Sequence, residues 1–424
     1  MLMTEVPSSG DIRILAAGLT RHSAASLQVA PNGSYSLREL ALNSDAVLVF
    51  DARVANDIEQ SLPALWEEIP AGETAFIALV PRRPSPQIDA SYGEPTSSFL
   101  CSSAVFERFV ELGIFCRGKT LCFAVLRAIV EGSLDVDRLL VRQVPLPARL
   151  EYAATSGSKA LVMPHRGDPA FLRAALKYIG KTKDAELKVR VGLDVEDCAP
   201  YETFPDEFPD VEFFDFSPSP LGPYVIRQEL AERSSETLLT LQESDDLSSY
   251  DRFAVLGAAL TETGCDIVGS HELCIDEIRS LVQPVRFPLD CTAALNLCPN
   301  HALLHGTMMT RRRVFFNAGG LSTHLPIAND TQFLLRAHFS STIRNVDEFL
   351  YIRRRHATSL TNAPETVYDN PLRRRLSKEW TGDFRAIVRG ELKLEDSSLR
   401  PVRRAEPFTI ARFLPGPKPL SATA

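Results

Sequence analysis

The sequence lacks the features that mark several common classes of protein. Its eight cysteines include no Cys-x-x-Cys pair, which argues against a zinc or redox site of that kind. The 46 Lys and Arg residues are outnumbered by 54 Asp and Glu residues, so the net charge of −8 gives no basic field for binding a nucleic acid. No dinucleotide-binding glycine-rich loop of the G-x-G-x-x-G kind occurs.

Signals for secretion and membrane insertion are also missing. The N-terminus carries Glu5 and Pro7 where a signal peptide needs a basic and then an apolar run. The most apolar stretch, 121–130, is about half as long as a membrane span and contains Arg127. We therefore expect a cytoplasmic protein with reduced cysteines.

What the sequence does contain is alternating strand and helix patterns in a chain of 424 residues, a length typical of two to three domains. Short apolar runs predict strands over 12–17, 46–50 and 74–80, and helical periodicity covers 102–130 with breaks near Gly113 and Gly118. These patterns predict an N-terminal α/β domain over 1–150, to which we assign no function.

A second α/β unit begins near residue 158. Strands are predicted over 159–163, 187–193, 211–216 and 237–241, and Asp168 followed by Pro169 is typical of a helix start. In open α/β sheets, ligands bind outside the carboxyl ends of the strands. A ligand site is therefore expected where these strands end.

Acidic residues stand at two of those strand ends. Asp194 follows one strand, and Glu243, Asp245 and Asp246 lie within four residues after another. Such a cluster is costly unless a cation offsets the repulsion, and hard oxygen ligands suit Mn²⁺ or Mg²⁺. The alternative is a solvated acidic turn before a helix.

The sequence around this cluster, PLGPYVIRQELAERSSETLLTLQESDDLSSYDRF, resembles the metal-binding region of family-2-like glycosyltransferases with the GT-A fold. Gly222, Arg227 and Gln228 match the helix of that region, and Glu243 to Asp246 match its acidic turn, with Glu243 in place of the usual first Asp. Arg252 matches a basic position that often follows the turn.

Three further segments are similar to the same family in the same order. KALVMPHRGDPAFLRAALKYI matches its opening strand, loop and helix, and VRVGLDVED matches its second strand. HGTMMTRRRVFFNAGGLSTHLPIANDTQFLLRAHF matches its acceptor side, and YIRRRHATSLT matches its closing strand and loop. The resemblance covers roughly 158–362, and it implies a GT-A-type domain with a mixed, mostly parallel sheet over that range.

The resemblance also implies roles for individual residues. Asp330 would be the catalytic base, although it could instead be only a first-turn acid of its helix. Arg353 to Arg355 and His356 would meet the diphosphate or the metal. The nucleotide contacts would be Pro164, His165, Arg166, Asp194, Arg227, Glu243 and Asp245, and the ligands of the Mn²⁺ or Mg²⁺ ion would be Asp245, Asp246 and His356.

The implied activity is transfer of a sugar from a nucleotide-diphosphate donor, UDP-linked, to an acceptor hydroxyl with inversion, in polysaccharide or glycoconjugate biosynthesis. Two alternatives stay open: a catalytically silent GT-A-like scaffold or binding protein, with Glu243 as the sign of lost turnover, and a nucleotidyltransferase. His301 and His305 have metal-ligand spacing, but the absence of a carboxylate pattern around them favours local packing.

The C-terminal part, 363–424, is predicted to be a basic extension, and its last residues, RFLPGPKPLSATA, to be disordered. Residues 371–424 contain twelve Lys and Arg and six Asp and Glu, so their net charge is about +6 and that of the rest of the chain is about −14. A glycan or lipid-linked acceptor is expected, and the basic region suggests peripheral contact with the inner face of a membrane.

Overall fold

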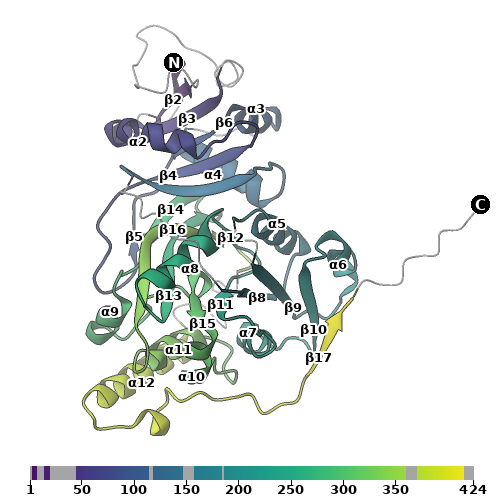
Figure 1. Ribbon diagram of the computed structural model, residues 1–424, viewed down its shortest axis with the longest axis vertical. Coiled ribbons are helices and arrows are strands. Elements are labelled where there is room, and N and C mark those ends of the chain that lie inside the picture. The colour runs from purple at the N-terminus through teal and green to yellow at the C-terminus, as the bar shows by residue number, and fades with distance from the viewer. Residues whose placement is uncertain are drawn as a thin grey trace, which may run out of the picture.

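Two β-sheets organise the chain in the computed structural model, which describes residues 2–6, 14–19, 44–113, 118–146, 157–183, 186–359 and 370–414 (Figure 1). The disorder predicted over 412–424 is wrong for Arg412 and Phe413, which lie in a strand. Its part beyond residue 414 and the beginning of the strand predicted from residue 12 lie outside these ranges. Within them, no helix combines the length and apolar character needed to cross a bilayer.

The first sheet has six strands, of which only β4 and β7 pair in parallel. Alternate residues of β3 face opposite sides, so that Leu48 packs with helix α2 and Val47 with helices α3 and α4. In sheet order the strands are β1 Leu2–Val6, β2 Ile14–Leu19, β3 Ala46–Asp51, β6 Ser98–Ser102, β4 Ala75–Pro81 and β7 Arg138–Val144, and the helices are α2 Ala55–Glu67, α3 Ser103–Glu111 and α4 Gly118–Val130.

The second sheet is mixed, as predicted, and the parallel pairing is confined to two places. The run β11–β8–β9–β10 is parallel throughout, and β13 pairs in parallel with β16, whereas the other ladders are antiparallel. In order, its strands are β12 Leu247–Ser248, β16 Ile343–Arg355, β13 Ile267–Asp276, β15 Met309–Arg311, β11 Leu238–Leu241, β8 Lys159–His165, β9 Leu187–Leu193, β10 Val211–Ser217 and β17 Thr409–Phe413, with β14 Leu281–Arg286 on β13 and β5 Ser91–Tyr92 on β14.

Helices cover both faces of this sheet. The apolar face formed by Ala160 and Val162 of β8 packs with one group of helices, and the face formed by Leu161 and Met163 packs with the other. The first group is α7 Pro223–Glu232, α9 Cys291–Leu297, α10 Arg312–Asn317, α11 Asn329–Ala337 and α12 Pro371–Val388, and the second is α5 Pro169–Gly180, α6 Phe204–Glu207 and α8 Arg252–Glu262.

Local sequence signals locate several of these elements. The Asp168 carboxylate caps α5 by accepting a hydrogen bond from the Ala170 amide at 2.8 Å, with Pro169 in the first turn. Gly192 in β9 leaves room for close packing, because a Cβ there would lie 2.8 Å from the Phe216 ring. The strand predicted over 187–193 is confirmed, and β11 begins one residue later than predicted.

The two sheets share one hydrophobic core. Val125 and Ile129 of α4, which cover the first sheet, also belong to the cluster that contains Leu273 of β13 and Ile352 of β16. Helix α4 accordingly lies between the two sheets (Figure 1). The described residues of the first 150 therefore support the second sheet through apolar packing, and the domain boundaries stay a prediction.

The C-terminal segment is also built into the second sheet's layers. Helix α12 buries Leu376, Trp380 and Phe384, which lie four residues apart on one face, in the core that contains α11. Strand β17 then pairs antiparallel with the outer edge of β10. The basic extension expected from composition thus contains a core helix and an edge strand over its described residues.

We expect Trp380→Ala to lower the free energy of unfolding by about 3–5 kcal/mol, because it removes a large side chain that is 2% exposed and leaves a cavity. Urea denaturation followed by circular dichroism measures this change. Lys378→Ala, an exposed position on the same helix, is the matched control and should cost less than about 0.5 kcal/mol. Equal stability of both variants would show that α12 is peripheral.

Candidate active site

The acidic turn 243–246 follows β11 at the carboxyl end of the parallel run, where a ligand site was expected. The guanidinium of Arg252, fully buried, fixes the backbone beside it by donating to the carbonyls of Leu241 at 2.7 Å and Gly306 at 2.6 Å. It also donates to the Gln242 side chain at 2.8 Å. Burial lowers the pKa of Arg252 only to about 10, so this anchor stays charged at neutral pH.

Asp246 is the most enclosed member of the turn. One carboxylate oxygen accepts a hydrogen bond from the Tyr351 hydroxyl at 2.7 Å, and the other accepts from the Arg354 amide at 2.7 Å. Tyr351 in turn accepts from the Glu243 amide at 3.1 Å. Burial and the neighbouring Asp245 raise the pKa of Asp246 well above its usual value. Because both oxygens have protein donors, the geometry points to an anchoring role for Asp246.

Asp245 and His356 form the pair that could hold a cation. The Asp245 carboxylate lies 2.9 Å from His356 Nε2, and the other ring nitrogen lies 2.8 Å from the Thr358 hydroxyl. The structure thus brings together two residues separated by 111 positions. In the described part of the chain no group of three or more metal-ligating side chains occurs. One carboxylate and one imidazole still fit Mn²⁺ or Mg²⁺, because such ions commonly complete their shell with phosphate oxygens and water.

Ser244 faces a different partner. His165, at the end of β8, contacts the Ser244 hydroxyl at 2.8 Å through Nδ1 and the Tyr201 hydroxyl at 2.9 Å through Nε2. Burial lowers the pKa of His165 to about 4, so the ring is neutral and braces the turn from inside. Of the predicted nucleotide-binding loop, Pro164 lies in the buried strand and Arg166 is exposed.

Asp194 organises the loop before α7. Its two carboxylate oxygens accept hydrogen bonds from the amides of Leu221 and Gly222, each at 2.8 Å. Gly222 has a φ of +90°, a conformation that favours glycine, which explains its place before the helix. The side chain predicted to touch the nucleotide is thus engaged with the loop that precedes α7.

Helix α7 joins the acidic turn to α11. The Arg227 guanidinium pairs with the Glu243 carboxylate, and three residues earlier on the same helix face the Tyr224 hydroxyl donates to Asp330 at 3.0 Å. Burial opposes ionisation of Asp330, but His301 and the hydrogen bonds from the Thr331 amide and Tyr224 hold its pKa below the usual value. Asp330 is therefore a charged carboxylate in the first turn of α11.

His301 and His305 do not lie one turn apart on an α-helix. Residues 301–304 are irregular, and His305 begins a short 3₁₀ turn, His305–Thr307. The His305 ring stacks on Tyr224 with 6.4 Å between ring centroids, and His301 contacts the Thr331 hydroxyl at 3.4 Å. Their spacing therefore reflects packing beside Asp330.

The three arginines that precede His356 are already paired with acids of β13 and its following turn. Arg353 lies 3.1 Å from Glu272, Arg355 lies 3.4 Å from Asp276, and Arg354 pairs with Glu277. Adjacent strands thus place opposite charges side by side, and the expected contact of these arginines with a diphosphate stays a prediction.

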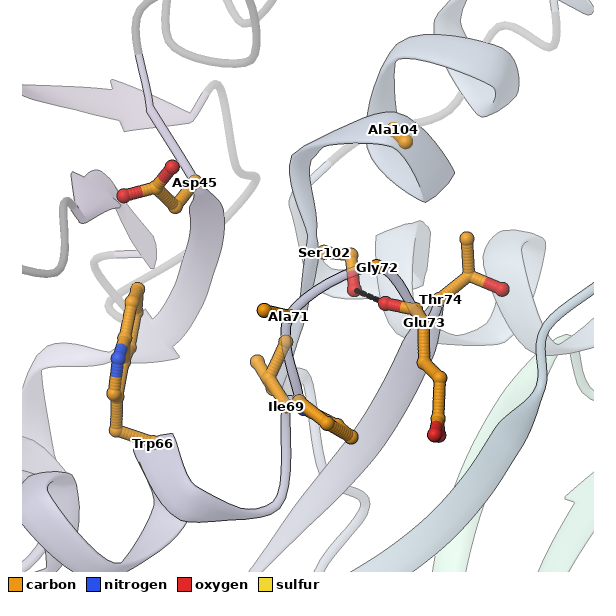
Figure 2. A pocket seen from close by; sticks show the side chains of 10 residues that line it. Asp45, Trp66, Ile69, Ala71, Gly72, Glu73, Thr74, Ser102 and Ala104 are labelled. Carbon is orange, nitrogen blue, oxygen red and sulfur yellow. Dashed lines mark hydrogen bonds between the residues drawn. The ribbon is translucent and has the colours of Figure 1, made fainter.

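Two cavities lie outside this cluster. One of about 380 Å³ is in the N-terminal unit, with Trp66 and Asp45 on one side and Ala71 and Ser102 on the other (Figure 2). The other, of about 430 Å³, lies at the ends of β9 and β10 and is lined by 195–198, Asp215 and 217–219. Only the second adjoins a predicted site residue, Asp194.

No protein-family model and no curated protein sequence matches the chain. Among solved structures, the chain is similar to S. aureus TarS in complex with UDP-GlcNAc, with a TM-score of 0.44 and 13% identity over 57% of this chain and 68% of that chain. It is also similar to the mannosyltransferase PcManGT from Pyrobaculum calidifontis in complex with GDP-Man and Mn²⁺, with a TM-score of 0.39 and 12% identity over 58% and 68% of the two chains. At such low TM-scores the likeness is distant, and the chemistry of the site follows from its own residues.

Sequence reasoning missed Tyr224 and Tyr351. Tyr224 had a detectable signal, because it lies three residues before Arg227 on a helix and therefore on the same face. Tyr351 had none, since its partner Asp246 is 105 residues away and the contact requires the pairing of β12 with β16.

We expect Tyr351→Phe to lower the free energy of unfolding by about 1–3 kcal/mol, because it leaves the buried Asp246 carboxylate with one donor fewer. Thermal and urea denaturation would measure the loss. Tyr92→Phe, at a residue 59% exposed, is the matched control with a change below about 0.5 kcal/mol. A Tyr351→Phe variant as stable as the control would refute the anchoring role of Asp246.

Proposed function

We propose that the protein is a metal-dependent glycosyltransferase that moves a sugar from a UDP-linked donor to an acceptor hydroxyl with inversion. The observation that carries the proposal is that one helix, α7, contacts both parts of the site. Arg227 pairs with Glu243 of the acidic turn that contains Asp245, the partner of His356, and Tyr224 donates to Asp330. A cation-binding pair and a separate charged base suit the transfer of a sugar from a nucleotide diphosphate.

In the proposed site, Asp245 and His356 hold Mn²⁺ or Mg²⁺, and Asp246 is left out because both its oxygens are bonded within the protein. The bound ion supplies neutralisation of the negative charge that develops on the leaving diphosphate. Tyr351 and Arg252 keep the turn in place, so that Asp245 is presented without rearrangement.

The nucleotide is proposed to bind across the ends of β8, β9 and β10. The cavity beside Asp194 provides space for the uracil and ribose, and Asp194 shapes its border through the loop 218–222. Exposed Arg166 is free to reach the nucleotide, and Arg227 with Glu243 borders the diphosphate side.

Asp330 is proposed as the base. Its pKa lies below the usual value, so it is ionised at neutral pH and accepts the proton of the acceptor hydroxyl as that oxygen attacks the anomeric carbon. With one base and no protein nucleophile assigned, the reaction is a single displacement that inverts the anomeric configuration.

The acceptor is proposed to be a glycan or a lipid-linked glycan, and the pathway polysaccharide or glycoconjugate biosynthesis. Exposed Arg374 and Arg375 on α12 support the proposed peripheral contact with anionic lipid. A cytoplasmic location stays a prediction.

The deciding experiment incubates the protein with Mn²⁺ and separate UDP-sugars and measures release of free UDP. We expect one UDP-sugar to yield free UDP, and we expect this release to stop when EDTA is added. Binding of UDP without turnover of any donor would instead identify a silent binding protein, for which the Arg227–Glu243 ion pair is the supporting observation. Pyrophosphate release from a nucleoside triphosphate would identify a nucleotidyltransferase.

Two substitutions separate the proposed roles. Asp245→Asn should abolish the gain in UDP affinity that Mn²⁺ produces, because it removes one of two protein ligands. Asp330→Asn should leave UDP affinity within about twofold and lower kcat by about 10²–10⁴-fold, because only proton transfer is lost. Calorimetry and initial rates measure the two effects. Exposed Asp206→Asn is the control, and full turnover by both site variants would refute the assignments.

Tyr224→Phe should move the acidic limb of the kcat/KM profile to higher pH. The hydroxyl helps to lower the pKa of Asp330, so its loss raises that pKa, and the base then becomes protonated at a higher pH. The effect should be confined to the acidic limb, because the carboxylate stays ionised at neutral pH after a modest rise in its pKa. Tyr250→Phe, whose ring packs on the Arg138 guanidinium, is the control that should keep the limb in place.

A further inference from the structure

His305 lies where the two halves of the site meet. Its ring stacks on Tyr224, whose hydroxyl holds Asp330, with only 12° between the ring planes. The next residue, Gly306, belongs to the other half, because its carbonyl accepts from Arg252 and a Cβ there would lie 2.7 Å from the Tyr351 hydroxyl. The position of the His305 ring is therefore fixed from both sides.

The ring carries a polar atom that the protein leaves unused. His305 is 5% exposed, and Nε2 has no hydrogen-bond partner anywhere in the described ranges. Leaving a buried polar atom unpaired costs about 1–3 kcal/mol, and such atoms in folded proteins are few. An external polar group at this position would recover that cost.

The charge state of the ring limits which group can bind. Burial and the adjacent Arg227 lower the pKa of His305 to about 3, so the imidazole is neutral at physiological pH. A neutral imidazole offers one donor and one acceptor, which matches a hydroxyl group, whereas a phosphate is better served by a cation.

The donor sugar is the part of the proposed substrate that spans this position. Its diphosphate would lie at Asp245 and His356, and its anomeric carbon would face Asp330. Residue 305 contacts Tyr224, the partner of Asp330, and residue 306 contacts Arg252 and Tyr351 beside the acidic turn. These two residues therefore lie between the proposed positions of the base and the diphosphate.

We infer that His305 Nε2 hydrogen-bonds a hydroxyl of the donor sugar and orients the sugar between the Asp245–His356 pair and Asp330. The inference rests on the proposed function and adds a residue that selects the sugar, separate from those that bind the nucleotide or the ion.

The test compares UDP with UDP-glucose, UDP-galactose and UDP-N-acetylglucosamine by calorimetry in the presence of Mn²⁺. The sugar that binds most tightly relative to UDP is taken as the preferred donor. His305→Leu should weaken binding of that donor about 5- to 20-fold and change binding of UDP less than twofold. His305→Gln, which retains a donor and an acceptor, should keep donor affinity within about threefold, and His338→Leu, at the residue that follows α11, is the control.

Monodeoxy analogues of the preferred donor give a second measurement that does not depend on the stability of His305→Leu. One analogue should bind more weakly than the parent donor to the wild-type protein, by a factor similar to the effect of His305→Leu. Against His305→Leu that analogue and the parent should bind equally. If the leucine variant does not fold, His305→Gln takes its place. The difference in affinity between the analogue and the parent donor should then be smaller for His305→Gln than for the wild-type protein.

Three results would overturn the inference. Equal weakening of UDP and donor would mean that His305 only supports the fold, and unchanged donor binding by His305→Leu would mean that Nε2 makes no sugar contact. If the wild-type protein binds UDP but binds no UDP-sugar more tightly than UDP, the sugar contact is also excluded. Nucleotide binding would then still stand. Absence of any UDP binding would instead overturn the proposed function, and the inference with it.

Discussion

The rest of the site depends on one constraint: carboxylates crowded into a buried turn must each have a hydrogen-bond or ion-pair partner. Like charges a few ångströms apart in a low-dielectric environment repel strongly, so the turn 243–246 is stable only if every polar group in it has its own partner. The partners come from different elements: Arg227 of α7 for Glu243, His165 of β8 for Ser244, His356 after β16 for Asp245, and Tyr351 of β16 for Asp246.

This constraint explains why strand β16 contacts both the acidic turn and the core beneath the first sheet. In this strand of 13 residues, Tyr351 faces the turn, while the adjacent Ile352 faces the core shared with α4. The described part of the N-terminal unit therefore packs against the strand that carries Tyr351. A buried ion pair, Arg142 with Asp251 at 2.7 Å, reinforces that contact just after the turn.

Local charge in the folded protein differs from what the composition suggests. The three consecutive arginines of β16 look like an anion-binding patch, but the neighbouring β13 and the turn after it supply an acid for each. Conversely, His305 looks like an ordinary packing residue in the sequence, and the structure leaves its Nε2 buried without a partner in the described chain. Pairing across strands and helices, rather than residue type, decides which charges a ligand meets.

The sequence by itself determined several of the elements and the position of the acidic turn. Hydrophobic runs defined β9, the Asp168–Pro169 pair set the start of α5, and the rule that ligands bind at strand ends singled out the acidic turn, because these signals act within a few residues. Only the tertiary structure decided which acid faces which partner. Asp246 and Asp245 are adjacent, yet one points to Tyr351 and the other to His356, and that choice depends on the pairing of β12 with β16 more than 100 residues later. Contacts over such separations arise from the packing of whole elements, which no local pattern encodes.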